Sequence, residues 1–378
     1  MKIIITGGAG FIGSNLAIQL SANDCQIIII DNLSPQIHGL NAGWPIQLLD
    51  NKNITLCHSD FRNFDSYLSH LNDADCIVHL AAETGTGQSM YSIEHYTNVN
   101  ISGTASLLER ISKRKIPLKK FVFASSRSIY GEGSYLDDEG RLQSPSSRKA
   151  HCLNKGLWEH YSSSDSKLRP IPTAEYHSIR PASIYAATKY SSELSCQIIS
   201  ESFGIPITIL RFQNIYGPGQ SLNNPYTGIL SIFSNQLRLE KPINIYEDGL
   251  ESRDFLFISD AVASLILALS HSDSIFNVFN VGTGVGSSVL SVAKQLKTLL
   301  KSDSDLKISG DFRLGDIRHC FADTFKASNE LGFSSKVDIE EGLYQFVEWV
   351  LKNPPSITNP DNALTEMMAL GLAGTSKK

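Results

Sequence analysis

The sequence predicts an α/β protein with a doubly wound parallel sheet and a smaller C-terminal α/β lobe. Two observations support this fold class. Short β-branched runs alternate with amphipathic stretches through the first half of the chain, which is typical of parallel strands joined by helices. A glycine-rich turn joins the first such run directly to the first amphipathic stretch. The 378 residues suffice for a main domain of roughly 200–250 residues and a second, smaller lobe.

Six runs in the first half have the length and the β-branched content of buried strands. They are Lys2–Ile5, Gln26–Ile30, Ile54–Cys57, Cys76–Leu80, Phe121–Ala124 and Ile207–Arg211. Helical patterns such as Ser14–Leu20 and Ile101–Ile111 lie between them. We therefore expect residues 1–213 to form the main domain. Residues 132–180 are polar, contain many Ser and Pro residues and are too long for an ordinary connection, so we expect an insertion over the active site.

The pattern becomes irregular after Asn214, and we expect residues 214–353 to form the smaller lobe, with returns to the main sheet at about 255–282. The pieces recognised there are Ile243–Tyr246, the strand Phe276–Val281, and the helical runs Ala261–Leu269, Ser287–Leu300 and Glu340–Leu351. Residues 354–378 are predicted to be a loosely ordered tail, in which Ala363–Leu372 could form a short helix.

The composition argues against several classes of protein. The net charge of −5 gives no basic field to attract nucleic acid or an anionic membrane, so we expect neither partner. No apolar stretch approaches the ~20 residues of a membrane span, and no signal peptide precedes the first strand. The six cysteines lack metal-binding or disulfide spacing. We expect a cytoplasmic protein with reduced thiols and no metal site.

Residues 6–13, TGGAGFIG, follow the first strand and open the first helix. The glycines satisfy the GxGxxG fingerprint of a Rossmann sheet and its short-chain variant, and they allow close backbone approach to a pyrophosphate. The helix N-terminus offers unpaired N–H groups to that anion. Asp31 ends the second strand at the expected offset, where its carboxylate accepts from both ribose hydroxyls and repels a 2′-phosphate. The predicted cofactor is therefore NAD rather than NADP.

Tyr185 and Lys189 lie four residues apart, so on a helix they share one face. The phenol has an ordinary pKa of about 10, and an adjacent ammonium and an oxidised nicotinamide favour its ionised form. Tyr185 can then take a hydroxyl proton while hydride leaves carbon. Ser126 follows a strand at the carboxyl edge of the sheet and can share that proton. Asn100 is expected to order the helix behind this site.

The chain resembles an extended short-chain dehydrogenase/reductase of the sugar-nucleotide epimerase/dehydratase family, from Met1 to about Leu351. The motifs that carry the resemblance are TGGAGFIG at 6–13, Asp31, HLAA at 79–82, Ser126 with YG at 130–131, Tyr185 with Lys189, RFQNIYGPG at 211–219, RDF at 253–255 and RLGD at 313–316. The resemblance implies that Asn214, Arg253 and Arg313 grip a nucleotide diphosphate, which fits the bidentate geometry of arginine. It also implies a homodimer through the helix of Tyr185 and Lys189.

The motifs and the resemblance together assign a catalytic set, Ser126, Tyr185 and Lys189, and two binding sets. The predicted NAD-binding residues are Gly7, Gly10, Phe11, Ile12, Gly13, Asp31, Asn32, Asp60, Phe61, Leu80, Ala81, Ala82, Asn100, Ser125, Tyr185 and Lys189. The predicted residues for the nucleotide-diphosphate sugar are Thr84, Gln88, Ser126, Arg127, Tyr185, Asn214, Gln220, Tyr226, Thr227, Tyr246, Arg253, Arg313 and Asp316.

The residues between Ser126 and Tyr130 separate the reactions of the family. A 4,6-dehydratase uses an acid and a base there, and a decarboxylase uses a glutamate at position 128. This chain has Arg127 and Ser128 instead. We therefore expect 4-epimerisation through transient oxidation at C4, or a simple 4-keto reduction. Asp31 favours retained NAD and so the epimerase. The intact catalytic set argues against a non-catalytic nucleotide sensor.

Several segments resemble the dTDP-L-rhamnose 4-epimerase branch, which makes dTDP-6-deoxy-L-talose. They include residues 82–91, 125–133 and 213–229. One departure is that relatives in that branch carry two cysteines after the tryptophan, where Ser162 and Asp165 stand here. A UDP-hexose or UDP-uronate 4-epimerase stays open as the alternative.

Overall fold

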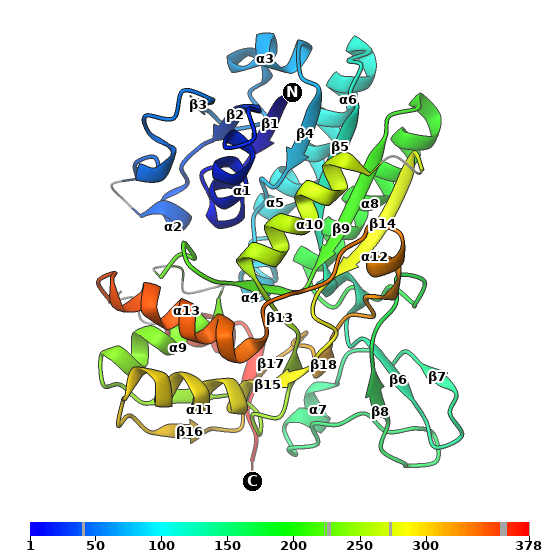
Figure 1. The fold of residues 1–378 in the computed structure, drawn as a ribbon. Helices are drawn as coiled ribbons and strands as arrows, with labels where there is room; N and C mark the ends of the chain where they lie inside the picture. The colour runs from blue at the N-terminus through cyan, green and yellow to red at the C-terminus, as the bar shows by residue number, and fades with distance from the viewer. Residues whose placement is uncertain (40–41, 223, 225–227, 272–273, 356–360, 378) are drawn as a thin grey trace.

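The centre of this computed structural model, which describes residues 1–39, 42–222, 224, 228–271, 274–355 and 361–377, is a parallel sheet (Figure 1). Its seven described strands run in the order β14–β9–β5–β4–β1–β2–β3. Their bounds are β1 (Lys2–Thr6), β2 (Gln26–Asp31), β3 (Ile54–His58), β4 (Cys76–His79), β5 (Lys120–Ser126), β9 (Ile207–Phe212) and β14 (Phe276–Val281). The predicted doubly wound α/β class is confirmed, and β14 is a return to the main sheet.

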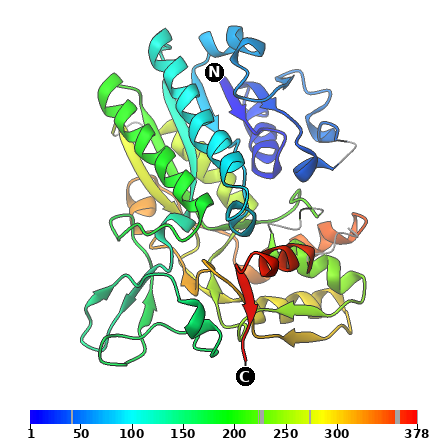
Figure 2. The same ribbon diagram turned by 180° about the vertical axis from the view of Figure 1, so that it is seen from behind.

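Alternation of side chains along the strands builds one apolar layer on each face of the sheet. Ile3 and Ile5 of β1 enter one core, while Ile4 between them enters the other. Two pairs of helices cover these layers (Figures 1 and 2). They are α1 (Phe11–Ser21) with α10 (Ile258–Ser270) on one face, and α6 (Thr104–Arg114) with α8 (Ile184–Phe203) on the other.

The smaller lobe lies beyond the carboxyl ends of the strands (Figure 1). Three helices pack together there: α9 (Ile229–Arg238), α11 (Val289–Leu300) and α13 (Ile339–Leu351). Short strands pair as β10 (Asn214–Tyr216) with β13 (Phe255–Phe257), β11 (Ile243–Ile245) with β16 (Leu306–Ile308), and β12 (Ser252–Arg253) with β15 (Ser287–Ser288) and β18 (His319–Cys320). These short strands bring distant segments of the chain side by side.

The insertion at 132–180 forms a small antiparallel sheet beside the lobe (Figure 1). Its elements are β6 (Ser134–Leu136), β7 (Leu142–Gln143), β8 (Arg169–Ile171) and α7 (Ala150–Leu153). The backbone N–H of Thr173 donates to Phe321 O at 2.9 Å. The insertion therefore packs against the segment around 316–322, and the described cofactor cavity is lined by other parts of the chain.

The remaining described helices are short, and one differs from the sequence prediction. Their bounds are α2 (Pro35–His38), η1 (Ile46–Leu48), η2 (Phe64–Ser66), α3 (Leu68–Asn72), α4 (Thr86–Ser89), α5 (Ile93–Tyr96), η3 (Thr97–Gly103), η4 (Arg127–Tyr130) and α12 (Phe325–Asn329). The helix predicted at Ile101–Ile111 starts in η3, a π-helix, and continues as α6. All six cysteines are free, and none of the described helices has the length and apolar character to span a membrane.

The end of the chain departs from the expectation of a loosely ordered tail. Its described part folds into α14 (Asp361–Ala369) and β19 (Ala373–Thr375). β19 pairs antiparallel with β17 (Asp311–Arg313) of the lobe. Leu364 and Met367 are buried. The apolar spacing within Ala363–Leu372 forms a helix because a surface of the protein is available to cover it.

Candidate active site

The glycine-rich turn leaves no room for side chains at two positions. Gly7 has φ +69°, and a Cβ added there would lie 2.7 Å from the backbone nitrogen of Ala81. A Cβ on Gly13 would lie 2.5 Å from Gly8 Cα. Gly10 begins α1 without a side-chain cap, so no side chain competes for the first N–H groups of the helix. The turn therefore presents bare backbone to an anion.

A cavity opens above this turn, and its walls contain most of the predicted cofactor residues. These lining residues are Gly7, Gly10, Phe11, Ile12, Gly13, Asp31, Asn32, Asp60, Phe61, Leu80, Ala81 and Ala82. Thr84 and Gln220, predicted for the sugar nucleotide, line the same cavity. The combination of backbone N–H groups, a carboxylate and apolar walls suits a dinucleotide.

Asp31 and Asp60, the two predicted acids that line the cavity, are held in different ways. Asp31 Oδ2 accepts from Ala9 N at 3.0 Å and Oδ1 accepts from Leu33 N at 2.9 Å, so the backbone fixes the carboxylate. Asp60 receives Arg62 Nε at 2.8 Å and Nη2 at 2.6 Å. The Arg62 hydrogen bond lowers the pKa of Asp60. Asp60 lines the cavity, as expected, but it is paired there with Arg62. This ion pair was not predicted from the sequence.

Asn100 and Ser125 engage their polar atoms with the protein behind the cavity. Asn100 Oδ1 accepts from Glu83 N at 2.8 Å, and its Nδ2 donates to Glu83 O at 3.1 Å and to Thr188 Oγ1 at 3.0 Å. Ser125 Oγ donates to Glu193. These bonds match the ordering role expected of Asn100, while the cofactor contact of both residues stays a prediction.

Helix α8 carries Tyr185 and Lys189, and Ser183 caps it by accepting from Ala186 N at 3.2 Å. The Tyr185 phenol lies near Ser126 at the end of β5. Burial raises the pKa of the phenol, while Ser126 and the positive charge of Arg127 oppose this rise. The structure therefore brings the predicted residues Ser126 and Tyr185 together, and Arg127 adds a positive charge that was not predicted to act on the phenol.

Lys189 is oriented by the strand behind it. Its Nζ donates to Ala124 O at 2.8 Å, and it lies 5.0 Å from the ring centre of Phe123. Burial lowers the pKa of Lys189 to about 8, against an opposing effect of Glu193 one turn further along the helix. Near neutral pH the Lys189 ammonium is therefore held by the Ala124 carbonyl near the carboxyl end of β5.

Glu193 and Arg211 form a buried network that the sequence analysis missed. Arg211 Nη2 donates to Glu193 Oε2 at 2.8 Å, and Arg211 Nη1 donates to Tyr130 Oη at 2.7 Å. A charged residue at the end of the apolar strand 207–212 was an available signal for a buried ion pair. The network joins β9, η4 and α8 behind the catalytic residues.

Two arginines predicted for the substrate lie close together on the lobe side. Arg127 Nε donates to Asn214 Oδ1 at 2.8 Å, while its Nη1 is buried without a hydrogen bond to the described residues. Arg253 Nη1 donates to Ser252 O at 2.8 Å and to Arg318 O at 3.1 Å. Burial and then the charge of Arg127 lower the pKa of Arg253. Partly buried like charges with an unused N–H suit an anionic ligand.

The other residues predicted for the substrate do not lie together: some are in the lobe and Gln88 is on α4. Arg313 Nε donates to Asp316 Oδ2 at 2.8 Å, and its guanidinium lies 5.2 Å from the ring centre of Tyr246. Gln88 exchanges hydrogen bonds with Gln36 at 2.9 and 3.1 Å on the cofactor side. Tyr226 and Thr227 lie outside the described residues.

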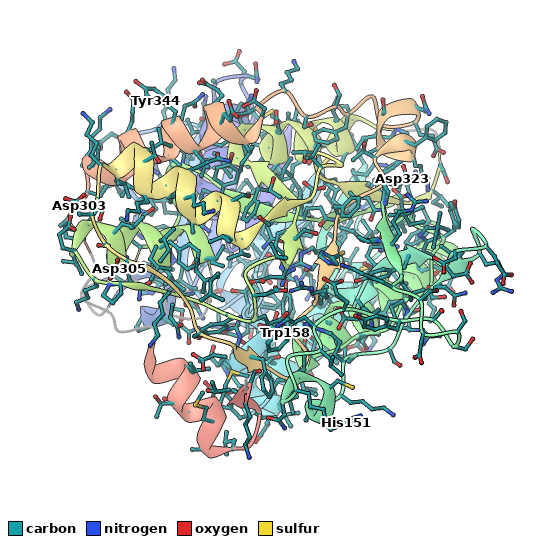
Figure 3. All side chains as sticks on the ribbon, turned by 90° about the horizontal axis from the view of Figure 1, so that it is seen from below. His151, Trp158, Asp303, Asp305, Asp323 and Tyr344 are labelled. Atoms are coloured by element: carbon teal, nitrogen blue, oxygen red, sulfur yellow. The ribbon has the colours of Figure 1, made fainter. Side chains whose placement is uncertain are left out.

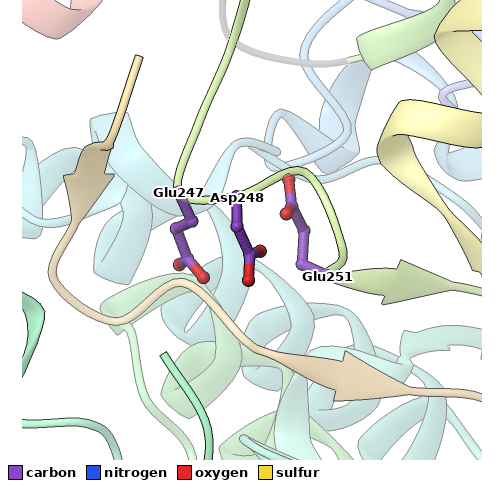
Figure 4. Close-up of side chains that lie close together, drawn as sticks. All are labelled: Glu247, Asp248 and Glu251. Atoms are coloured by element: carbon purple, nitrogen blue, oxygen red, sulfur yellow. The ribbon is translucent and has the colours of Figure 1, made fainter. Parts of the chain in front are cut away.

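A second network missed by the sequence analysis surrounds Arg318, which is fully buried. Glu247, Asp248 and Glu251 gather on the turn before β12 (Figure 4). Arg318 Nη1 lies 3.0 Å from Glu247 Oε2, 2.7 Å from Asp248 Oδ1 and 3.9 Å from Glu251 Oε2. The guanidinium therefore pairs closely with Glu247 and Asp248, while Glu251 lies further away.

Arg148 ties the insertion to this network. Its Nη1 donates to Glu247 Oε2 at 2.7 Å, and its Nη2 donates to Asp316 O at 2.8 Å. Glu132 Oε2 accepts from the backbone N–H of Arg318 at 2.6 Å. The insertion thus supports the segment that carries Arg313 and Asp316, which were predicted to bind the substrate.

Comparison with known families decides the identity of this scaffold. The model of the NAD dependent epimerase/dehydratase family matches residues 3–282. The chain belongs to this family. The predicted extended short-chain dehydrogenase/reductase type is confirmed, and with it the enzyme class and the cofactor NAD.

Similar proteins of known name act on different sugar nucleotides. The dTDP-L-rhamnose 4-epimerase of Burkholderia thailandensis is 35% identical over 92% of this chain and 94% of its own length. The structure of the Thermotoga maritima UDP-glucose 4-epimerase with UDP-glucose has a TM-score of 0.74 and 30% identity, covering 93% of this chain and 99% of its own. A Bacillus cereus UDP-glucuronic acid 4-epimerase structure with NAD has a TM-score of 0.75 and 29% identity, at the same coverage.

Proposed function

We propose that this protein is an NAD-dependent 4-epimerase of a nucleotide-diphosphate sugar. The observation that carries the proposal is the turn after β5, where Ser126 lies near Tyr185 and Arg127 donates a hydrogen bond to Asn214. Neither Arg127 nor Ser128 offers the carboxyl group with which a dehydratase eliminates water. The same turn offers a hydroxyl and a positive charge, which suit oxidation of an alcohol beside an anion.

In the proposed reaction, Tyr185 and Ser126 share the proton of the C4 hydroxyl of the sugar. Lys189 and Arg127 supply positive charge that favours the ionised phenol during this transfer. NAD, when bound, supplies the acceptor and then the donor of the C4 hydride. Arg253, Arg313 and Asn214 hold the diphosphate, so that the 4-keto sugar can turn about this anchor and present its other face.

We propose dTDP-L-rhamnose and dTDP-6-deoxy-L-talose as the interconverted pair. The support is the 35% identity to the Burkholderia enzyme together with the motif likeness of residues 82–91, 125–133 and 213–220. UDP-hexoses and UDP-uronates are the second candidates, because UDP-sugar epimerases share the fold with 29–30% identity. A 4-keto reductase is the third, and it would consume a reduced cofactor.

One experiment separates these candidates. The purified protein is incubated with dTDP-L-rhamnose, UDP-galactose or UDP-glucuronate, and the products are resolved by NMR. We expect interconversion of the dTDP sugar without added cofactor, and near-stoichiometric NAD(H) released on denaturation. Turnover of a UDP sugar alone would move the substrate to the second class, and turnover that requires added NADPH would favour the reductase.

We further propose a cytoplasmic homodimer that packs through α8. Leu194, Ile198 and Phe203 on this helix are 42%, 61% and 59% exposed, which is unusual for large apolar side chains on one helix. Light scattering of the purified protein tests the dimer. An Ile198→Asp variant should favour the monomer if α8 forms the interface.

A further inference from the structure

The segment 361–377 connects two opposite walls of the proposed substrate site. It consists of α14, a turn and β19, and it lies beyond the residues matched by the family model. Figure 2 shows it as the red helix and strand that end at the C-terminus, and the strand pairs with β17. We call residues 361–377 the strap.

At one end the strap completes the element that carries Arg313. In the β17–β19 pair, Arg313 faces Ala373 and Asp311 faces Thr375. The backbone N–H of Leu314 donates to Leu372 O at 2.8 Å, and Thr375 Oγ1 donates to Asp311 Oδ1 at 2.5 Å. β19 is the one described strand that pairs with β17. Asn244 and Glu247 of the lobe hold Asp311 as well, so the strap contributes to the position of β17 together with them.

The fit at this end is close enough to exclude a side chain. A Cβ added to Gly374 would lie 2.9 Å from the ring of Phe312. That ring also packs against Trp158 of the insertion, labelled in Figure 3, with centroids 6.3 Å apart. The backbone N–H of Lys377 donates to Asn154 O at 3.0 Å. The strap is therefore anchored to both β17 and the insertion.

At the other end the strap packs on α4, on the cofactor side. Met367 is 2% exposed, and its Sδ lies 3.0 Å from the position of a Cβ on Gly87. Tyr91 Oη donates to Glu366 Oε2 at 2.9 Å. Within α4, Ser89 Oγ accepts from the backbone N–H of Tyr185 at 3.0 Å. The strap thus touches the helix that supports the catalytic tyrosine and carries Gln88.

We propose that the strap is a positioning element for the nucleotide sugar, setting the separation between Arg313 on β17 and the wall formed by α4. This inference rests on the proposed function, because it assumes that Arg313 binds the substrate. The residues that line the NAD cavity include none from the strap. Loss of the strap should therefore weaken binding of the sugar nucleotide more than binding of NAD.

The test compares the full chain with a variant that ends at Asn353 and with point variants of α14. Met367→Ala removes the buried contact with α4, and Met367→Leu restores its apolar volume. Met368→Ala is the matched control, because Met368 is the next residue and is 38% exposed. Each protein is assayed for KM, kcat, calorimetric binding of dTDP, and NAD(H) content.

In the shortened chain we expect KM to rise by about tenfold or more, and the affinity for dTDP to fall by about the same factor. We expect kcat to stay within about threefold of the full chain and NAD(H) content to stay unchanged. Met367→Ala should show a smaller rise in KM and a smaller fall in dTDP affinity, again with kcat and NAD(H) content nearly unchanged. Met367→Leu should restore KM and dTDP affinity, and Met368→Ala should match the full chain in all four quantities. If the shortened chain fails to fold, the three point variants decide.

Unchanged KM and dTDP affinity in the shortened chain and in Met367→Ala would overturn the inference. So would an equal loss of NAD(H) content and kcat, which indicates general unfolding. If the full chain itself binds neither dTDP nor UDP, the proposed function fails first and the inference falls with it. Binding by the full chain that survives removal of the strap refutes the inference alone.

Discussion

In the sheet half of the protein, short contiguous motifs surround the cofactor cavity, and backbone groups hold its key carboxylate, Asp31. The lobe half instead gathers charged side chains from distant segments, with the partly buried Arg127 and Arg253 close enough for one to lower the pKa of the other. The first arrangement leaves little room for added atoms at the glycine-rich turn. The second places two arginines side by side, with carboxylates such as Glu251 nearby. From this difference we expect NAD binding to depend mainly on shape, and binding of the sugar nucleotide to depend mainly on electrostatics.

In the proposed reaction Tyr185 acts where the sugar meets NAD, so its loss should have the largest effect. Tyr185→Phe removes the proton acceptor and should lower kcat by about 10³-fold, with NAD(H) content retained because the cavity is intact. Tyr190→Phe, five residues along the same helix, is the matched control. Full turnover by Tyr185→Phe in an NMR assay would refute the mechanism.

Gly13→Ala tests the dependence of the cofactor half on shape. The new Cβ would lie 2.5 Å from Gly8 Cα, so the turn must shift. Overpacking of this kind costs about 1–3 kcal/mol, or roughly 5- to 150-fold in NAD affinity. Gly43→Ala is the control, because nothing lies within 4 Å of a Cβ there. Measured NAD(H) content that is equal in both variants would contradict the assignment of this turn.

Arg253→Gln tests the electrostatic half. Loss of one charged hydrogen-bond donor to a diphosphate should raise KM by about tenfold or more, with little change in NAD(H) content. The effect should shrink at high salt because screening already weakens the attraction in the unaltered protein. Arg114→Gln, an exposed arginine at the end of α6, is the control. A fall in kcat with constant KM would place Arg253 outside diphosphate binding.

Glu251→Gln should have the smallest effect and a characteristic pH dependence. Burial raises the pKa of Glu251 to about 7, and Oε2 accepts no hydrogen bond from the described residues. Because the native pKa exceeds the unfolded value, the native state binds more protons between them. Stability is therefore present at low pH and is lost as pH rises through about 7.

Ionised Glu251 also adds negative charge beside Arg253, so affinity for the diphosphate should fall over the same range. In Glu251→Gln, the slope of stability should flatten in thermal unfolding measured from about pH 4.5 to about pH 8, and the slope of affinity should flatten in KM measured from about pH 6 to about pH 8. Glu201→Gln, at an exposed position on α8, should keep them. Parallel pH profiles for Glu251→Gln and the unaltered protein would place the titrating group elsewhere.

The sequence predicted the cofactor half well because its determinants are local. The glycine spacing, the acid at the end of β2 and the pair on α8 each lie within one element or turn. Apolar runs likewise located the strands to within one or two residues, and the largest difference is the two extra residues at the carboxyl end of Lys120–Ser126. Such patterns depend on backbone geometry that neighbouring residues impose.

The buried networks were not predictable in the same way. Arg318 meets Glu132, 186 positions away, and Glu159, 159 positions away. Neither pairing leaves a periodic signal, since both depend on how the insertion packs against the lobe. The order of α14 was missed for a similar reason, because its apolar face is covered by residues near position 87.

The pair of like charges at Arg127 and Arg253 also bears on the choice of buffer. Two neighbouring guanidinium groups attract small anions from solution, and sulfate and phosphate offer the tetrahedral oxygens that guanidinium groups prefer. Kinetic constants measured in phosphate would then include competition by the buffer. Chloride salts of an amine buffer, with pyrophosphate as a deliberate competitor, would give the affinity of the empty site.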